Sequence, residues 1–266
     1  MENSMKNSDE VAIRLNRMEI IAKQAGQLAM SYFRSHVPGQ RVKGPQDFVS
    51  EADCRVEALI RKSISKAFHN DGIIGEEYGF QKEGSRYTWV VDPIDGTTVF
   101  LSGLPGWVVS LALLENREVV AGVIYDPCGN ESFKVHRGHN AWLNNMVLPK
   151  LAPSDLGSGL VGVGFPGNGD PKAFGGLMAA LLERGGNFYR NGSAASMLAQ
   201  VAAGRLAGLY QTHLNAWDCF AGLLLIEETG GNLLPYDVEK MMTSGGPVLG
   251  AVPGVFEQLL EIVPVK

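Results

Sequence analysis

The chain has 266 residues, which fits one large domain or two small lobes. Hydrophobic residues make up 45% of the sequence and charged residues 19%, and this composition excludes an intrinsically disordered protein. The formal net charge of −5 argues against general nucleic-acid binding and against docking on an anionic membrane.

Helical spacing of apolar residues comes first along the chain. It predicts helices over residues 14–33 and 51–68. Runs rich in β-branched and aromatic residues then predict strands over residues 88–91, 108–114, 119–125 and 132–136, with a hairpin turn at 115–117. The proline after the first of these strands is expected to end it.

From about residue 151, short strands alternate with helices. Strands are predicted over 160–165, 188–190, 206–210 and 248–252, and helices over 171–184, 193–203, 216–229 and 254–263. Asp170 and Pro171 suit the N-cap and the first position of one of these helices. This change predicts an N-terminal α+β lobe over 1–150 and a C-terminal α/β lobe over 151–266.

The N-terminus and the cysteines bear on the compartment. The first ten residues are polar and lack the apolar stretch of a signal peptide. The longest apolar runs fall well short of the roughly 20 residues that a membrane helix needs. Cys54, Cys128 and Cys219 are far apart, odd in number and without CxxC spacing, which favours reduced thiols. We therefore predict a cytoplasmic protein.

Two carboxylates stand three residues apart where a buried strand is expected to end. Asp92 and Asp95 flank Pro-Ile, and a glycine follows them. The proline and the glycine allow a sharp turn, so both side chains can converge on one point. Thr97 and Thr98 come next, and their backbone N–H groups could bind an anion if a helix starts there.

Further acids recur at comparable places. Glu76 and Glu77 follow an apolar run, Asp218 opens an apolar helix three residues after Asn215, and Asp53 lies near another helix start. Each acid alone also fits an ordinary turn, a solvated surface or a capping box. Brought together, they would repel one another and need a cation between them. Oxygen ligands without a His/Cys cluster favour Mg²⁺ or Mn²⁺ over Zn²⁺.

These residues resemble the signatures of the inositol monophosphatase family, whose members are Mg²⁺-dependent, lithium-sensitive phosphatases. Residues 92–100 match the pattern D-P-[ILM]-D-G-[ST]-x-x-[FY], and residues 217–222 match W-D-x-x-[AG]-[GA]. The Glu76-Glu77 pair and the segment 47–53 agree in order and spacing. The likeness covers roughly residues 14 to 262.

The resemblance implies a mixed α+β and α/β fold, the five-layer αβαβα sandwich of this family, in a homodimer. It implies hydrolysis of a small phosphomonoester with two or three Mg²⁺ ions, for which Mn²⁺ can substitute. The implied ligands of the first metal are Glu76, Asp92 and the carbonyl of Ile94. Those of the second are Asp92, Asp95 and Asp218, and Glu76 would hold a weaker third ion with Glu77 nearby.

The resemblance also implies catalytic and substrate-binding roles. Thr97, paired with Asp53, would position and deprotonate the attacking water, and Glu77 is counted with these catalytic residues. The implied substrate contacts are Lys43, Gly96, Thr97, Thr98, Gly192, Ser193, Ala194 and Gln211.

Two departures from the family pattern bear on the substrate. Many members have Asn where this chain has Val99, and inositol-specific members have Glu at the position of Gln211. An amide can hydrogen-bond hydroxyl groups but carries no charge. Inositol monophosphate, histidinol phosphate, sugar phosphates or bisphosphates, and nucleotide 2′- or 3′-phosphates all stay open as substrates.

Two other classes of protein compete with this interpretation. Residues 162–167 satisfy the dinucleotide-binding pattern G-x-G-x-x-G, but Pro166 precedes the last glycine and no acid stands at the end of the next strand. A regulatory, moonlighting binding protein is the other alternative. The full set of expected ligands and the lack of a basic stripe argue against that role and against direct RNA binding.

Overall fold

The computed structural model describes the backbone of residues 2–34, 41–44, 47–49, 51–165 and 169–264, and the side chains of residues 9–34, 51–165 and 169–264. The helices are α1 (Glu2–Tyr32), α2 (Glu51–Ala67), α3 (Thr97–Leu101), η1 (Leu156–Ser158), α4 (Pro171–Glu183), α5 (Ala194–Ala202), α6 (Ala216–Glu228), α7 (Val238–Ser244) and α8 (Val255–Leu260). The strands are β1 (Arg41–Gly44), β2 (Asp47–Val49), β3 (Gly72–Gly75), β4 (Gly79–Gln81), β5 (Tyr87–Asp95), β6 (Val108–Glu115), β7 (Glu118–Asp126), β8 (Glu131–His136), β9 (Ala141–Leu143), β10 (Met146–Val147), β11 (Leu160–Gly164), β12 (Asn187–Tyr189), β13 (Gly208–Leu214), β14 (Asn232–Leu233) and β15 (Gly246–Ala251).

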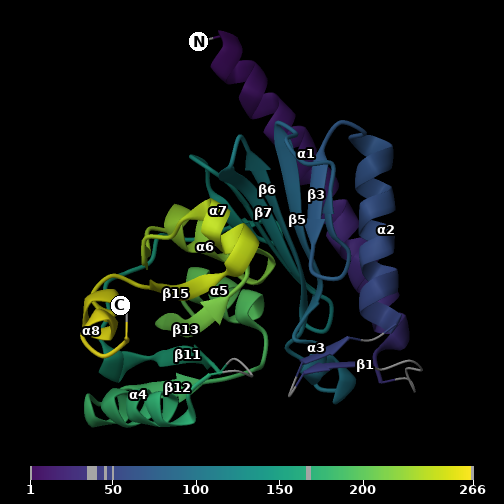
Figure 1. Cartoon of the computed structure of the whole chain (residues 1–266). Helices are drawn as coiled ribbons and strands as arrows, with labels where there is room; N and C mark the ends of the chain where they lie inside the picture. Colours follow the sequence, from purple (N-terminus) through teal and green to yellow (C-terminus); the bar gives the residue numbers. More distant parts are fainter. Residues whose placement is uncertain (1, 35–40, 45–46, 50, 166–168, 265–266) are drawn as a thin grey trace.

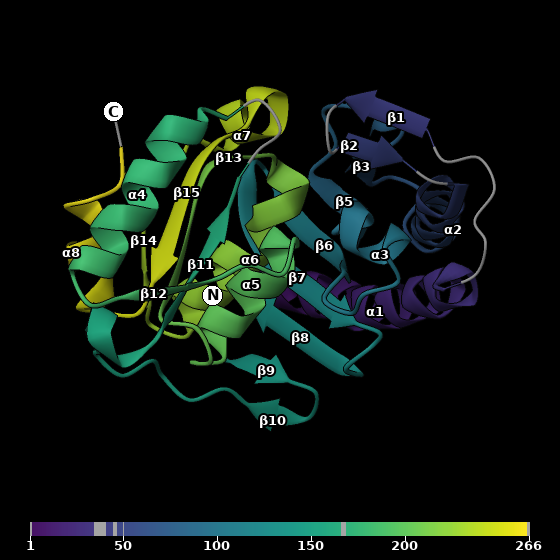
Figure 2. The ribbon, with the colours of Figure 1, turned by 90° about the horizontal axis from the view of Figure 1, so that it is seen from below.

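Two large sheets form the frame of the described part of the chain. One has eight strands in the order β10-β9-β8-β7-β6-β5-β3-β4, and the other has five in the order β12-β11-β13-β15-β14. β3 pairs parallel with β5, and β11 pairs parallel with β12 and β13. Figures 1 and 2 show α1 and α2 outside the larger sheet, α5 and α6 between the sheets, and α4 and α8 outside the smaller sheet. This arrangement confirms the predicted five-layer sandwich.

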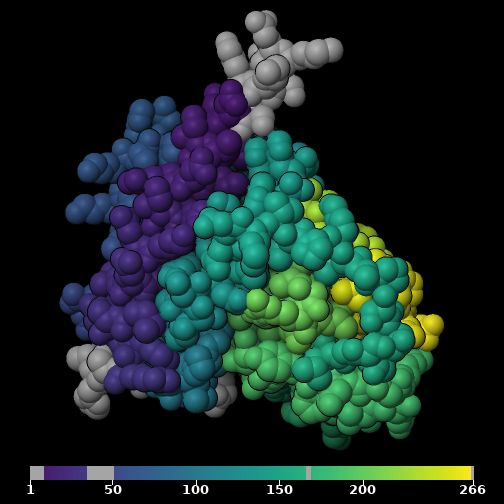
Figure 3. Space-filling model, turned by 180° about the vertical axis from the view of Figure 1, so that it is seen from behind, coloured from purple at the N-terminus to yellow at the C-terminus, as the bar shows by residue number. Residues whose placement is uncertain are grey.

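Buried apolar side chains join the layers. Met18 of α1, Ile60 of α2 and Val91 of β5 belong to one cluster on the outer face of the larger sheet. Figure 3 shows α1 along the back of the molecule, beside α2 and the strands of this sheet. Because α1 and α2 cover the outer face of this sheet and α5 and α6 its inner face, the central strands are buried on both faces and read as continuous apolar runs.

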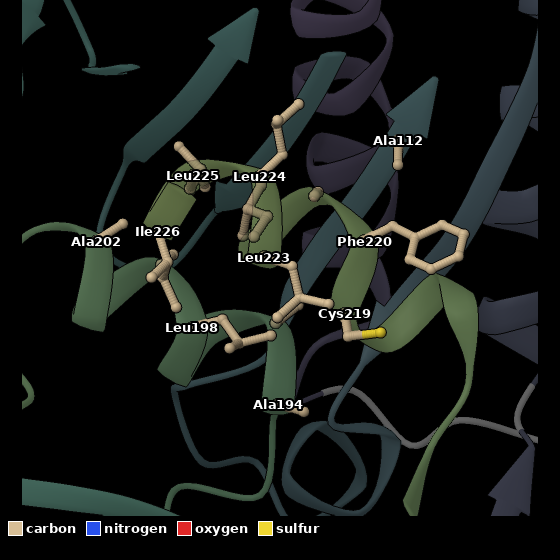
Figure 4. Packing of buried hydrophobic residues seen from close by; sticks show 14 of the residues in the cluster. Ala112, Ala194, Leu198, Ala202, Cys219, Phe220, Leu223, Leu224, Leu225 and Ile226 are labelled. Carbon is tan, nitrogen blue, oxygen red and sulfur yellow. The ribbon is translucent and has the colours of Figure 1, made fainter. Parts of the chain in front are cut away.

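The middle layer consists of two strongly apolar helices, α5 and α6. α6 is buried over most of its length, as expected of a helix that is hydrophobic all round. Figure 4 shows Leu198 of α5 beside Leu223 and Ile226 of α6. A rigid, close-packed α6 fixes the position of the side chains at its N-terminus, where Asp218 lies.

The sequence-based prediction missed several elements, among them β3, β4 and α7, and three further differences concern where elements begin and end. α1 begins at Glu2, well before residue 14. β5 does not end before Asp92: it continues through Pro93 to Asp95, and its register with β6 shifts between the two acids. This irregularity accommodates a proline, which cannot donate to the ladder. The turn between β6 and β7 has two residues, Asn116 and Arg117, both with positive φ (49° and 72°), as in the tightest hairpin turns.

The N-cap predicted for the helix that begins at Pro171 is confirmed. The side chain of Asp170 accepts a hydrogen bond from the backbone N–H of Lys172, and Pro171 occupies the first turn of α4. The division into lobes 1–150 and 151–266 stays a prediction, since one buried cluster contains Val90 of β5 together with Leu209 of β13. Among the described residues, no helix combines the length and the apolar character that crossing a membrane requires.

Candidate active site

The end of β5 carries two of the predicted metal ligands. Asp92 is paired with Ser110 of β6 and Asp95 with Val108, with the register shift between them. Asp92 Oδ1 accepts a hydrogen bond from the N–H of Ile94 at 3.0 Å, which closes a tight turn around Pro93. Because the shift breaks the strand's alternation, both carboxylates can face the same side, as the spacing predicted.

Asp218 completes a cluster of three acids. It is the third residue of α6 and forms a capping box with Asn215, whose N–H donates to Asp218 Oδ2 at 2.7 Å. Among the side chains that the structure describes, Asp92, Asp95 and Asp218 each offer a carboxylate oxygen within 4.8 Å of the other two. The capping-box interpretation and the ligand interpretation of Asp218 are therefore compatible.

Burial and repulsion make these acids hard to ionise. Burial, followed by repulsion from Glu76 and Asp95, raises the pKa of Asp92 well above its usual range. Burial raises the pKa of Asp95 to about 6, although hydrogen bonds from the start of α5 lower it. Burial and the charge of Asp95 raise the pKa of Asp218 to about 7. Perturbed acids gathered at one point are a mark of functional sites.

The donor set fits a hard divalent cation. The cluster offers carboxylate oxygens, which Mg²⁺ and Mn²⁺ prefer. Burial is the main cause of the raised pKa values, and repulsion adds to it at Asp92 and Asp218. A cation between the three acids would compensate these buried negative charges. The residues present therefore fit the metal that the family resemblance implies.

Glu76 and Glu77 occupy the turn between β3 and β4. The N–H of Glu76 donates to the carbonyl of Val91 at 3.2 Å, which ties the turn to β5 beside Asp92. Glu76 lies outside the group of three acids, but its charge is the strongest of those acting on Asp92. The structure therefore brings Glu76 to the edge of the cluster.

Thr97 and Asp53 meet as the resemblance implied. Thr97 Oγ1 lies 3.2 Å from Asp53 Oδ1 and 3.2 Å from the carbonyl oxygen of Ile94. Asp53 is fully buried at the N-terminus of α2. α3 begins at Thr97, and Gly96, with φ 96°, precedes it without a side-chain cap. The helix start expected at Thr97 and Thr98 is present, and the binding of an anion by its backbone N–H groups stays a prediction.

The start of α5 contacts Asp95 directly, a long-range contact that no local sequence pattern predicts. Ser193 Oγ and the N–H of Ala195 both donate to Asp95 Oδ2 at 2.6 Å. The residues predicted to face substrate, Gly192 to Ala194, thus adjoin the acid cluster. A Cβ on Gly192 would lie 2.4 Å from Val99 Cγ2, so Val99 packs against this turn and a larger residue at 192 would clash.

A cavity of about 150 Å³ lies beside the acids. It is lined by Asp95, Asp218, Gly192, Gln211, Arg190 and Phe165 among others. Gln211 Nε2 donates to the carbonyl of His213 at 3.1 Å. Larger hollows of about 520 and 640 Å³ lie elsewhere and lack the three clustered acids.

Two residues at the site were not predicted from the sequence, and some predicted ones lie outside the described part of the chain. Arg190 lines the cavity but was not predicted; its place just before the segment 191–194 was the available signal. Glu57, fully buried next to the Glu76-Glu77 turn, was also missed. The side chain of Lys43 and residues 166–168 of the glycine-rich segment lie outside the described residues.

Comparison with known proteins identifies the family. The inositol monophosphatase family matches residues 13–263. The chain is 39% identical over 254 residues to a Mesorhizobium japonicum protein named inositol-1-monophosphatase, covering 94% of this chain and 95% of that one. It is 35% identical over 245 residues to the Nus factor SuhB of Haemophilus influenzae, covering 90% and 91%.

Solved structures of similar proteins have the same fold as this chain. The extragenic suppressor protein suhB of Bartonella henselae superposes with a TM-score of 0.88 at 30% identity, covering 96% of this chain and 99% of that one. An IMPase of Thermotoga maritima gives 0.84 at 28% identity, covering 94% and 96%. The five-layer fold is shared with these solved structures, and the family match over nearly the whole chain supports a phosphatase. The chain belongs to the inositol monophosphatase family.

Proposed function

We propose that this chain is a Mg²⁺-dependent phosphomonoesterase that hydrolyses a small phosphorylated metabolite. The observation that carries the proposal is the cluster of Asp92, Asp95 and Asp218, within 4.8 Å of one another, beside the Thr97–Asp53 pair. A nucleophile-activating pair next to a cation site is what hydrolysis of a phosphomonoester needs.

The proposed ligands divide between two ions. Glu76, Asp92 and the carbonyl of Ile94 would hold one, and Asp92, Asp95 and Asp218 would hold the other, with Glu76 and Glu77 near a weaker third. Bound Mg²⁺ or Mn²⁺ would acidify a water molecule and neutralise negative charge on the leaving oxygen. The raised pKa values of Asp92 and Asp218 support this assignment, because a bound cation would compensate both the burial of their charges and the repulsion between the acids.

The protein groups would carry out the rest of the reaction. Thr97 Oγ1 would accept a hydrogen bond from the attacking water and donate its own proton to Asp53. The water oxygen would form a bond to phosphorus and pass its proton to Thr97 Oγ1 as the Thr97 proton moves to Asp53. The ester P–O bond would break, and the leaving alkoxide would take its proton from a solvent water molecule. The N–H groups at the start of α3, from Gly96 to Thr98, would hold the phosphate oxygens.

The leaving group would lie on the side of α5 and β13. Gly192, Ser193 and Ala194 adjoin Asp95 there, and Gln211 lines the adjoining cavity. Inositol monophosphate is the first candidate because a relative at 39% identity is named inositol-1-monophosphatase. The neutral Gln211 keeps histidinol phosphate, sugar phosphates and nucleotide 2′- or 3′-phosphates in the panel. Lys43 stays a predicted phosphate contact.

Release of inorganic phosphate from this panel tests the proposal. With Mg²⁺, we expect turnover of at least one class of substrate, loss of turnover in EDTA, and inhibition by Li⁺. Asp92→Asn and Asp95→Asn should lose nearly all turnover. Wild-type turnover by purified Asp95→Asn at saturating Mg²⁺ would show that the metal assignment is wrong.

The regulatory alternative has a specific basis, since several relatives at about 35% identity are named Nus factor SuhB. A folded protein with no phosphatase activity across the panel would favour it. The homodimer and the cytoplasmic location also stay predictions. Light scattering during gel filtration tests the first, and fractionation of the source cells tests the second.

A further inference from the structure

Glu57 is a charged side chain enclosed by protein. It lies on α2, its exposed fraction is 0%, and its carboxylate reaches the turn that carries Glu76 and Glu77. Glu57 Oε2 accepts a hydrogen bond from the N–H of Glu77 at 2.8 Å, and Oε1 accepts one from the N–H of Tyr78 at 3.3 Å. Burying a carboxylate is costly unless partners compensate it, so these contacts fix where the turn can lie.

Arg61, one helical turn further on, completes this contact. Its Nε donates to Glu57 Oε1 at 2.7 Å, and its terminal nitrogen donates to the carbonyl of Gly79. The guanidinium also lies 5.8 Å from the centre of the Tyr78 ring. The pair Glu57–Arg61 therefore contacts the middle of the turn between β3 and β4 and the first residue of β4.

Gly75, the last residue of β3, makes this approach possible. A Cβ at this position would lie 2.2 Å from Glu57 Oε1 and 2.9 Å from Oε2. Because real side chains do not approach so closely, any residue larger than glycine would displace the carboxylate or the strand. Substitution of Gly75 and substitution of Glu57 should therefore disturb the same contact in two independent ways.

The face of α2 that carries Glu57 also carries Asp53, which contacts Thr97. Asp53, Glu57 and Arg61 are spaced four residues apart, so they lie on one side of the helix. Asp53 contacts Thr97 at the start of α3, while Glu57 contacts the turn next to Asp92. One rigid helix therefore sets the distance between the proposed water-activating pair and the proposed ligand Glu76.

We propose that Glu57 is a positioning residue, which holds the Glu76-Glu77 turn so that Glu76 is directed at the metal cluster. The inference rests on the proposed function, since it concerns the metal held by that same site. Glu57 itself donates no ligand: its oxygens are used by Arg61 and by the two backbone N–H groups. Groups that orient metal ligands in this way typically contribute about 10–100-fold to metal affinity.

Binding of Mn²⁺ to EDTA-treated protein, followed by calorimetry and by electron paramagnetic resonance, tests the proposal without relying on turnover. Glu57→Gln keeps the size of the side chain but removes its charge and one acceptor. Gly75→Ala pushes the intact carboxylate away. We expect both variants to bind Mn²⁺ about 10–100-fold more weakly than wild type. Turnover at saturating Mg²⁺ should fall much less than turnover at limiting Mg²⁺.

Matched controls separate positioning from simple loss of stability. Glu19→Gln removes a partly buried carboxylate paired with Lys23 on α1, and Gly175→Ala adds a methyl group on α4 where nothing lies within 4 Å. Both controls should bind Mn²⁺ with wild-type affinity. The thermal midpoint of each variant in EDTA reports its folding, and if Glu57→Gln does not fold, Gly75→Ala decides by the same criterion.

The outcomes are distinct. Folded Glu57→Gln or Gly75→Ala with wild-type Mn²⁺ affinity would overturn the positioning role while leaving the proposed phosphatase intact. A wild-type protein that binds no Mn²⁺ would instead overturn the proposed metal site. A lower thermal midpoint with unchanged Mn²⁺ affinity would make Glu57 a structural residue and also refute the proposal.

Discussion

Ser193 and Asp95 meet across the junction of two layers: Ser193 Oγ, at the N-cap of α5, donates to Asp95 Oδ2, at the end of β5, at 2.6 Å. The N–H of Ala195 donates to the same oxygen. A carboxylate at a helix N-terminus is favoured by the helix dipole. Asp95 thus belongs to the acid cluster and also accepts hydrogen bonds from the start of α5.

Replacing the hydroxyl of Ser193 should affect both folding and activity. Ser193→Ala removes a donor to Asp95 and the N-cap bond to the N–H of Ser196. We expect a loss of about 1 kcal/mol of stability, a fall in Tm of about 2–4 °C, and a clear loss of kcat. The control Asp170→Ala removes the cap of α4, so it should lower Tm similarly and leave kcat unchanged. If Ser193→Ala and Asp170→Ala had the same kcat, Ser193 would have no role in turnover.

Removing Asp218's charge should stabilise the metal-free protein while abolishing its activity. Asn can still accept the hydrogen bond from Asn215, but it no longer repels Asp95. Asp218→Asn is therefore expected to unfold at a higher temperature than wild type in EDTA near pH 8 and to lose phosphatase activity. Asp237→Asn, at the exposed N-cap of α7, should not raise Tm. A lower Tm for Asp218→Asn would contradict the repulsion argument.

The stability of the metal-free protein should depend on pH in a defined direction. Asp95 and Asp218 have folded-state pKa values of about 6 and about 7, above the value of 3.8 for a free Asp. The folded protein therefore binds their protons more tightly, and the stability this gives is complete below about pH 4 and is lost as pH rises through 6 and 7. Tm measured in EDTA should fall between about pH 5 and about pH 8.

Added Mg²⁺ should remove this dependence, because a cation replaces the protons that the three acids otherwise hold. Differential scanning calorimetry with EDTA and with Mg²⁺ makes the comparison directly. A Tm in EDTA that rises over the same interval would mean that the acids are not the groups controlling stability.

The hydroxyl of Thr97 should matter for turnover more than for binding. Thr97→Val keeps the size of the side chain but loses the contact with Asp53 at 3.2 Å. We expect kcat to fall about 10²–10⁴-fold with little change in KM, as for loss of a general acid–base group. Thr97→Ser keeps the hydroxyl and should retain most of the activity. A Thr97→Val enzyme with normal kcat would exclude the proposed water-activating pair.

Local patterns predicted the caps and the cluster of acids because each depends on a few neighbouring residues. Asp170 before Pro171, and Asn215 before Asp218, specify helix starts by their own side chains. Segment 92–98 likewise contains its own turn. Contacts such as Ser193 with Asp95 join residues 98 apart in the chain, so only the folded layers reveal them.

The contact that Glu57 makes could not be predicted from the sequence, for a different reason. With Arg61 four residues later, it has the spacing of an exposed helical ion pair, the same spacing as Glu51 with Arg55 on that helix. Only tertiary packing distinguishes the two pairs: the first is buried against the β3–β4 turn and the second is largely exposed. The continuation of β5 through Pro93 was missed for a similar reason, since β6 supplies the pairing that holds it.

The attachment of Asp218 to α6 has a consequence for mutational scanning. This acid is carried by a helix whose body is embedded among Leu198, Leu223 and their neighbours. A cavity opened among them lets the helix shift, and its first turn shifts with it. Substitutions deep in the apolar interior should then be recovered in a screen for lost turnover, and a map of such variants would trace the course of α6 through the protein.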